Sequence, residues 1–224
     1  NCKLPFNQRI FWRSIMKPIL HVGQFGIFAA TFFHAVITNP PPITRSFEEG
    51  FRIGVKSLPI LIIISFFVGT NLSIQGYNVF QLLGATNYVG TFVALAGVRE
   101  LAPIMVAALI SAKAGTEMAS QIAVMRIREE IDALHVMAIN PHWFLIAPRF
   151  CGILIVLPAL TILSIFTLIG SAWLVAVLQL GLHGGDFLIQ ASQAMQGMDL
   201  IYCCCKAIAF GTLICLISCF YGFN

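Results

Sequence analysis

Long apolar blocks dominate the pattern of this sequence, and short polar segments separate them. A helix needs about 20 apolar residues to cross the hydrocarbon core of a bilayer, and four blocks meet this length. The third block exceeds one perpendicular crossing, so it should tilt, or bend near Pro158 or Gly170. The pattern predicts an all-α polytopic membrane protein with membrane spans at residues 53–73, 88–112, 150–182 and 200–223.

The composition excludes the soluble classes of protein. Of 224 residues, 58% are hydrophobic and 10% are charged, with a mean hydropathy of +0.89. Soluble domains average about 45–50% apolar and about 25% charged residues. Six of the seven cysteines lie in apolar blocks at spacings that fit neither a zinc site nor a disulfide framework. We therefore expect an integral membrane protein that binds no metal and no cofactor.

The distribution of basic residues predicts the topology. Lysine and arginine occur in residues 1–56 and 113–149, whereas residues 57–98 and 150–205 contain none. Basic loops stay on the cytoplasmic side of a membrane, so four spans with a cytoplasmic N-terminus fit this distribution. The net charge of +4 then reflects loops that face anionic lipid, and no basic patch for nucleic acid is present.

The N-terminal region differs from the four blocks. Residues 1–17 mix cationic and aromatic side chains, which is typical of a helix that lies at the bilayer surface. Residues 18–38 are a weaker apolar stretch that either dips into the membrane or continues the surface helix. Three prolines at 40–42 end this segment, because proline cannot continue a helix. Residues 1–38 are therefore predicted to be an interfacial region.

Two adjacent charges, Arg99 and Glu100, lie within the second block. Ionisable groups at membrane depth are costly and face a cavity or a partner, so they are candidates for a functional site. A structural ion pair or a snorkelling helix end is the alternative. Pro103 follows them and frees a backbone carbonyl about one turn earlier. A ladder of small residues then permits close helix packing, within one subunit or between two: Ala107, Ser111, Gly115 and Ala119.

Residues 120–137 have the periodicity of an amphipathic helix on the predicted cytoplasmic side. One face carries Val124, Ile127, Ile131 and Leu134, and another carries Arg126, Glu129 and Glu130. Such a helix either rests on lipid or docks a cytoplasmic partner, and amphipathicity alone does not decide between them. The sequence contains no catalytic constellation and no phosphate-binding loop, so this chain is predicted to be no enzyme and to bind no ATP itself.

The segment 99–149 combines several short motifs: Arg99-Glu100-Leu101-Ala102-Pro103, Met125-Arg126, Glu129, Asp132-Ala133-Leu134, Asn140-Pro141 and Pro148-Arg149. In this register the segment resembles the signature core of the MlaE-type permeases, the membrane subunits of MCE-linked ABC lipid transporters. The chain departs from that pattern with Lys113 for arginine, Thr116 for serine, Ser120-Gln121 for Ala-Glu, and Glu130 for glutamine.

The resemblance implies an ABCG-like permease fold with an N-terminal interfacial helix and five spans. The fifth span would follow residue 224, and this chain either lacks it naturally or continues beyond the given sequence. The membrane would be a bacterial inner membrane or the plastid inner envelope. Two permease copies would enclose a lipid cavity, an ABC ATPase using ATP and magnesium would dock on residues 120–137, and an MCE-domain protein would sit on the opposite side.

The expected function is therefore that of a permease subunit that moves phospholipid or a related lipid. The alternatives are a structural membrane-anchor subunit and an ion-coupled secondary transporter that uses Arg99 and Glu100. The expected substrate-binding residues are Leu72, Gln75, Tyr77, Arg99 and Glu100. The expected ATPase-coupling residues are Met125, Arg126, Glu129, Glu130, Asp132 and Leu134.

Overall fold

The computed structural model describes residues 23–32, 34, 36, 43–137 and 141–223, and every regular element in this part of the chain is helical. Among the described residues, four helical stretches are long and apolar enough to cross a membrane. This number agrees with the four spans expected from the apolar blocks. Each stretch is longer than the block that predicted it: Ile43–Leu82, Thr86–Ile127, Trp143–Leu178 and Gly197–Phe223.

The first stretch, α2 (Ile43–Leu82), continues for nine residues beyond the predicted span. The sequence favoured a turn-rich connection over residues 74–87, but residues 74–82 are helical and the turn begins only at residue 83. Gly76 is buried there, and a Cβ atom at this position would lie 2.8 Å from Phe92 Cδ1. Gly76 therefore does not break α2, and its lack of a side chain allows the second helix to approach α2 closely.

The second stretch is one continuous helix with two π-helical turns. It runs through η1 (Thr86–Tyr88), α3 (Val89–Ala96), the π turn η2 (Gly97–Leu101), α4 (Ala102–Ile110), the π turn η3 (Ser111–Gly115) and α5 (Thr116–Ile127). Single π turns inside α-helices occur frequently at functional sites. The first of them contains Arg99 and Glu100.

The predicted single helix over residues 120–137 is wrong, because the structure divides it. The helix α5 ends at Ile127, and α6 (Glu130–Val136) follows in a new direction after Glu129, whose φ is +61°. A left-handed residue cannot continue a right-handed helix. The predicted apolar face is split accordingly: Ile131 and Leu134 are buried in the core, whereas Ile127 is 81% exposed.

Four more helices follow in the second half of the described chain. These are η4 (His142–Ile146), α7 (Ala147–Leu178), the short α8 (Gly184–Ala194) and α9 (Gly197–Phe223). Pro158 lies inside α7 without ending the helix. The helix α8 was not expected in the polar connection. At the α2–α7 contact the two backbones touch, since a Cβ atom at Gly152 would lie 2.8 Å from the Gly50 nitrogen.

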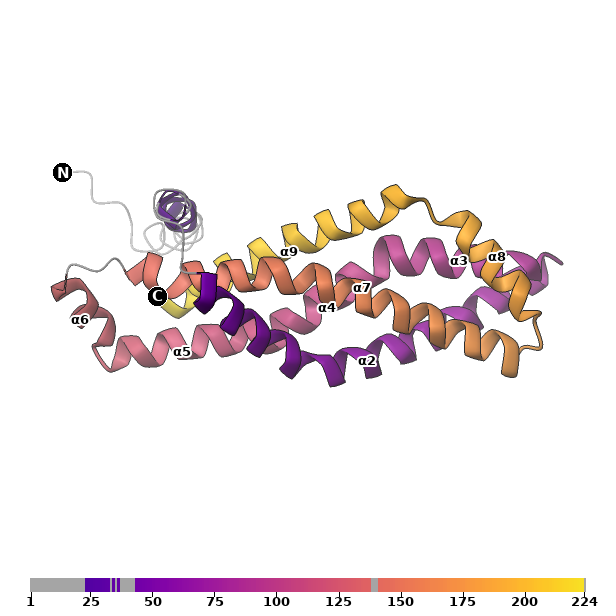
Figure 1. Cartoon of the computed structure of the whole chain (residues 1–224), viewed down its shortest axis with the longest axis horizontal. Coiled ribbons are helices and arrows are strands. Elements are labelled where there is room, and N and C mark those ends of the chain that lie inside the picture. The colour runs from indigo at the N-terminus through magenta and orange to yellow at the C-terminus, as the bar shows by residue number, and fades with distance from the viewer. Residues whose placement is uncertain (1–22, 33, 35, 37–42, 138–140, 224) are drawn as a thin grey trace, which may run out of the picture.

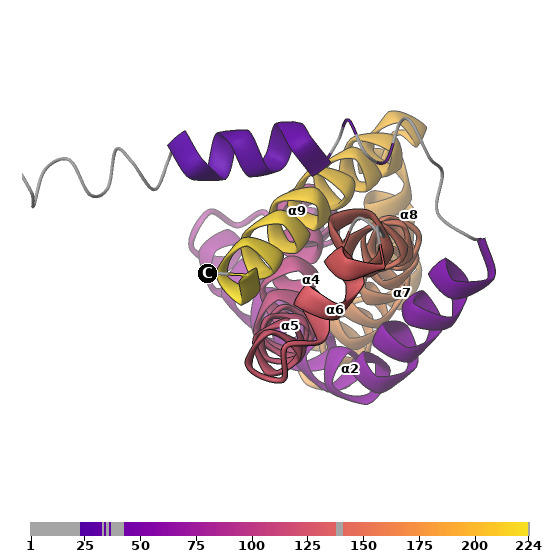
Figure 2. The ribbon, with the colours of Figure 1, turned by 90° about the vertical axis from the view of Figure 1, so that its left-hand side faces the viewer.

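The helices form an elongated bundle with two distinct ends (Figure 1). The helix α6 and the end of α9 lie at one end, and α8 lies at the other. Residues 23–32 form a helix that runs across the bundle near the end of α9, as the view along the bundle shows (Figure 2). Phe25 in this helix packs edge-to-face on Phe220 of α9, with ring centroids 5.5 Å apart. The rest of the predicted interfacial region 1–38, namely residues 1–22, 33, 35, 37 and 38, lies outside the described residues.

Candidate functional site

Arg99 forms an ion pair with a carboxylate from the other half of the chain. Its Nε lies 2.8 Å from Asp199 Oδ1, and its Nη2 donates to Asp199 Oδ2 at 3.1 Å. This two-point geometry matches the planar guanidinium fork to the planar carboxylate. Asp199 lies in the first turn of α9, where a negative charge is favoured by the helix dipole, and its Oδ2 also accepts the Gln196 backbone N–H.

Glu100 forms a second ion pair with the same helix. Its Oε1 lies 2.8 Å from Lys206 Nζ. Lys206 Nζ also donates to the Arg99 carbonyl oxygen at 2.8 Å. Pro103 explains why that carbonyl needs a partner, because proline has no N–H to donate to the carbonyl four residues earlier. The expected freed carbonyl is therefore present, and a lysine from α9 satisfies it.

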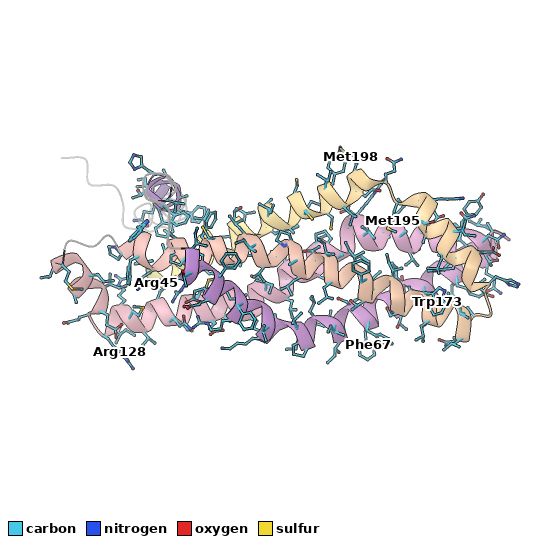
Figure 3. The ribbon with its side chains drawn as sticks, viewed as in Figure 1. Arg45, Phe67, Arg128, Trp173, Met195 and Met198 are labelled. Carbon is cyan, nitrogen blue, oxygen red and sulfur yellow. The ribbon has the colours of Figure 1, made fainter. Side chains whose placement is uncertain are left out.

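These four residues, which we call the charged quartet (Arg99, Glu100, Asp199 and Lys206), carry no net formal charge. Asp199 is buried, with 7% of its side chain exposed, while Arg99, Glu100 and Lys206 expose between 41% and 61%. A cavity of about 500 Å³ adjoins the quartet and is also lined by Gln196, Met198, Tyr202 and Cys205. The side-chain view places Met198 at the start of α9, between the two ends of the bundle (Figure 3).

Arg99 and Glu100 lie well inside the second candidate membrane-crossing helix, whereas their partner Asp199 lies in the first turn of the fourth. Arg99 is about 20 Å along the helix axis from Thr86, at 1.5 Å per residue. The exposed parts of the three outer side chains face the adjoining cavity, where water or a ligand can contact them. The quartet is thus a set of paired donors and acceptors beside a cavity, which suits the recognition of a polar or zwitterionic group.

An apolar groove of about 290 Å³ continues from the quartet along the same two helices. We call it the α4–α9 groove. On one side it is lined by Ile104, Ala107, Ala108 and Ser111, and on the other by Phe210, Leu213, Ile214, Ile217 and Ser218. Each set continues the helix face of Glu100 or Lys206 at steps of three or four residues. A charged cavity and an apolar groove therefore lie in succession along the contact between α4 and α9.

The predicted ladder of small residues faces α9 within the same chain. Ala107 and Ser111 line the α4–α9 groove. Beyond the groove, a Cβ atom at Gly115 would lie 2.8 Å from Ser218 Oγ, and one at Gly222 would lie 3.0 Å from the Ala119 carbonyl oxygen. At Gly115 and Ala119 the ladder thus brings the backbone of the second helix close to that of α9 inside one subunit. At Ala107 and Ser111 it leaves the α4–α9 groove open.

The structure does not place the other three expected substrate residues in the quartet cavity. Leu72 and Tyr77 are half-buried and pack on an apolar cluster that contains Val89, Val93 and Phe187. Gln75 is exposed on α2. Leu72 approaches Gly97 of the π turn, with its Cδ2 atom 3.5 Å from the position of a Cβ there. These residues lie near the helix that carries the quartet but do not line its cavity.

The expected coupling residues gather at the α5–α6 end of the bundle. Arg126, Glu129, Glu130 and Asp132 are exposed, Met125 is half-buried and Leu134 is buried. Arg126 donates to the Phe223 carbonyl oxygen, which ties α5 to the end of α9. The side-chain view shows Arg128 at this same end (Figure 3), where it forms an ion pair with Glu130 at 3.9 Å. Leu134 therefore packs α6 onto the core, while the charged residues are exposed.

Two members of the quartet, Asp199 and Lys206, were not among the expected site residues. A signal was present in the sequence. Asp199 and Lys206 are seven residues apart, so they fall on one face of an apolar helix, and their charges complement those of Arg99 and Glu100. Among the described residues no group of three His, Cys, Asp or Glu side chains could hold a metal ion. The quartet therefore offers ion-pair and hydrogen-bond contacts.

Comparison with known proteins places the chain in one family. Residues 47–224 match the model of the permease MlaE family. A probable ABC transporter permease protein of Rickettsia prowazekii is 30% identical over 90% of this chain and 78% of the relative. One from Synechocystis is 31% identical over 90% of this chain and 76% of its own length. The chloroplastic protein TRIGALACTOSYLDIACYLGLYCEROL 1 of Arabidopsis thaliana is 27% identical over 98% of this chain and 62% of its own length.

Proposed function

The chain belongs to the MlaE permease family, and from this premise we propose that it binds a phospholipid or a related lipid between α4 and α9 and moves it with energy from a separate ATPase. The observation that carries the proposal is the succession of a charged cavity and an apolar groove on one pair of helices. A lipid has the same succession of a polar headgroup and acyl chains.

The chemistry of the quartet fits a headgroup. Arg99 and Lys206 offer donors to a phosphate, and Glu100 offers an acceptor to a cationic or hydroxylated headgroup. The exposed fractions of these three side chains leave them accessible, while buried Asp199 holds Arg99 in place. Acyl chains in the α4–α9 groove would remove apolar surface from contact with any water in the cavity, which is favourable at about 25 cal/mol per Å².

The energy source must lie in another subunit. The relatives are named as ABC transporter permeases, and this chain contains no loop that cradles nucleotide phosphates. We propose that the ATPase, with its own ATP and magnesium, contacts the exposed charges of the α5–α6 end. Arg126, Glu129, Glu130 and Asp132 supply these contacts, and the buried Leu134 fixes the orientation of α6.

The remaining partners follow from the lipid path. Both the cavity and the groove are open on the side away from the bundle core, so a second permease copy would close them into a chamber. An MCE-domain protein at the α8 end would pass lipid to or from this chamber. The protein is an integral membrane protein, and we propose the bacterial inner membrane or the plastid inner envelope as its location. The Arabidopsis relative, whose name contains that of a galactolipid, is named as chloroplastic.

Lipid capture by photo-crosslinkers tests the binding path. Crosslinkers at Tyr202 and Leu213 should capture lipid that resists repeated detergent exchange of the purified complex. Crosslinkers at Leu72 and Tyr77 test whether the chamber extends to α2. Phe67, which is 66% exposed, serves as the control because lipid at that surface is removed by detergent exchange. Equal capture at Phe67 and Leu213 would contradict a specific path.

Reconstitution in vesicles separates this function from its two alternatives. The proposal requires lipid movement that depends on the ATPase and on ATP. A secondary transporter using Arg99 and Glu100 would instead respond to an ion gradient, and a structural anchor would support no movement in either condition. The two ion pairs favour the first outcome, since both charges are already neutralised by α9.

A further inference from the structure

Arg149 is a buried cation at the start of α7, far along the bundle from the quartet. It is 8% exposed and lies next to the core around Ala147 and Phe150. Burial of a guanidinium removes its hydration, so it requires a counter-charge and hydrogen bonds from its surroundings. The surroundings of Arg149 supply the hydrogen bonds only in part.

The contacts of Arg149 leave its charge uncompensated within the described part of the chain. Its Nη2 donates to the neutral amide of Gln121, at 2.9 Å from Oε1. Its Nη1 is buried and has no hydrogen-bond partner among the described residues, and no ion pair to Arg149 occurs among them. Glu117 is linked to Arg149 through the Gln121 amide, but the ion pair of Glu117 is with Lys56 at 3.5 Å.

Arg149 also lines a cavity of about 440 Å³ between α2, η4 and α7. The cationic residues of this cavity are Arg45, Arg52 and Arg149, and the acidic ones are Glu48 and Glu49. Glu49 pairs with Arg52 at 2.8 Å, and Arg45 stacks over the Phe144 ring at 4.8 Å from its centroid. After these contacts, Arg45 and Arg149 retain positive charge that the exposed Glu48 offsets only in part. The lining also contains apolar side chains, namely Phe144, Leu145 and Pro148.

We propose that this cavity, which we call the Arg149 cavity, binds the phosphate of an anionic phospholipid from the adjoining leaflet. It is separate from the path between α4 and α9, so the proposal does not depend on lipid transport. The phosphate would compensate Arg149 and accept a hydrogen bond from it, and the glycerol and upper acyl chains would contact Phe144 and Leu145. A lipid anchored here fixes α2 against α7.

The neighbouring surface favours a lipid over an acidic protein segment. The same helix α2 carries an exposed apolar stripe at four-residue steps on a face other than that of the cavity residues: Ile43, Phe47, Phe51 and Val55. Such a stripe fits acyl chains at the edge of a bilayer, whereas an acidic peptide would leave it uncovered. Figure 3 shows Arg45 near the end of the bundle that holds α6, where headgroups of one leaflet would lie.

Native mass spectrometry of the purified complex tests the proposal. The complex is titrated with phosphatidylglycerol and with phosphatidylcholine of the same acyl chains, and bound lipids are counted. We expect one phosphatidylglycerol bound roughly tenfold more tightly than phosphatidylcholine, which corresponds to about 1.4 kcal/mol. The key variant is Gln121→Glu, which places a carboxylate next to Arg149 without removing any buried atom. It should abolish the preference for the anionic lipid.

Two further variants control for charge and for folding. Arg45→Gln, at an exposed position of the same cavity, should weaken the preference, while Arg128→Gln makes the same charge change outside the cavity and should leave it unchanged. Inorganic phosphate added at millimolar concentration separates the sources of the anion. Displacement of phosphatidylglycerol by inorganic phosphate would mean that the cavity takes free phosphate, and it would overturn the lipid proposal. A complex without lipid preference, or a Gln121→Glu variant that keeps it, would also overturn it.

Discussion

Two regions of the molecule differ in how their charged side chains are paired: the contact between α4 and α9, and the α5–α6 end of the bundle. Arg99 and Glu100 each have an opposite charge at 2.8 Å within the chain. Arg149 has only an amide, and the exposed Glu129 and Asp132 form no ion pair among the described residues. Charges that this chain satisfies itself shape a permanent binding surface. Charges that it does not pair itself remain free for the contacts with other molecules that we propose.

Reversal of the charges at the α5–α6 end should give the largest effect. In the proposed complex, Glu129→Lys together with Asp132→Lys should release the ATPase, because breaking charge contacts at a desolvated interface weakens binding by about 2–5 kcal/mol. Co-purification of the ATPase measures this loss, and insertion of the permease should be unchanged. Asp186→Lys, which reverses an acidic charge at the opposite end in α8, is the control. Normal ATPase retention by the double variant would contradict the docking role.

The contact of α2 and α7 beside the Arg149 cavity should be sensitive to one methyl group. Gly152→Ala should lower the free energy of unfolding by about 1–3 kcal/mol, since its Cβ would lie 2.8 Å from the Gly50 backbone nitrogen. Gly170→Ala, in the same helix with nothing within 4 Å, should raise it by up to about 1 kcal/mol through helix propensity. Thermal unfolding of the purified protein in detergent measures both. Equal effects at the two glycines would contradict the close packing.

The two acids of the quartet should differ in their contribution. Asp199→Asn should destabilise the protein by about 1–3 kcal/mol, because it leaves the Arg99 guanidinium without its buried counter-charge. Glu100→Gln should change stability by less than about 1 kcal/mol, because Glu100 is 61% exposed. Chemical denaturation of both variants tests this order. A larger loss of stability in Glu100→Gln than in Asp199→Asn would contradict the view that Asp199 contributes most to the stability of the quartet.

The smallest expected effect is a gain. Gln121→Glu should stabilise the lipid-free protein by up to about 1 kcal/mol at low ionic strength, because it gives Arg149 a carboxylate partner. The gain is limited by repulsion from Glu117, whose Oε1 now accepts the Gln121 amide at 3.3 Å. Thermal unfolding at two salt concentrations measures it. Destabilisation that persists when Glu117 is also changed to Gln would show that Arg149 is compensated in another way.

Much of the fold could be predicted from the sequence because lipid imposes a strong pattern. Apolar blocks gave four crossing helices, and adjacent charges in an apolar block marked Arg99 and Glu100. The partners Asp199 and Lys206 could not be identified, because their pairing spans about one hundred residues and depends on the rotation of α9. The break at Glu129 was also hidden, since glutamate is a good helix former and the burial of Ile131 and Leu134 that accompanies the break is a tertiary feature.

Transport through the α4–α9 groove tests the central claim most directly. Ala108 is exposed and lines this groove, so Ala108→Trp would fill the groove without disturbing the core. The control is Ile63→Trp on the exposed face of α2. In vesicles containing the ATPase complex, we expect Ala108→Trp to abolish ATP-driven lipid movement and Ile63→Trp to leave it unchanged. Lipid movement at the parental rate by a folded, ATPase-bound Ala108→Trp variant would contradict the proposed path.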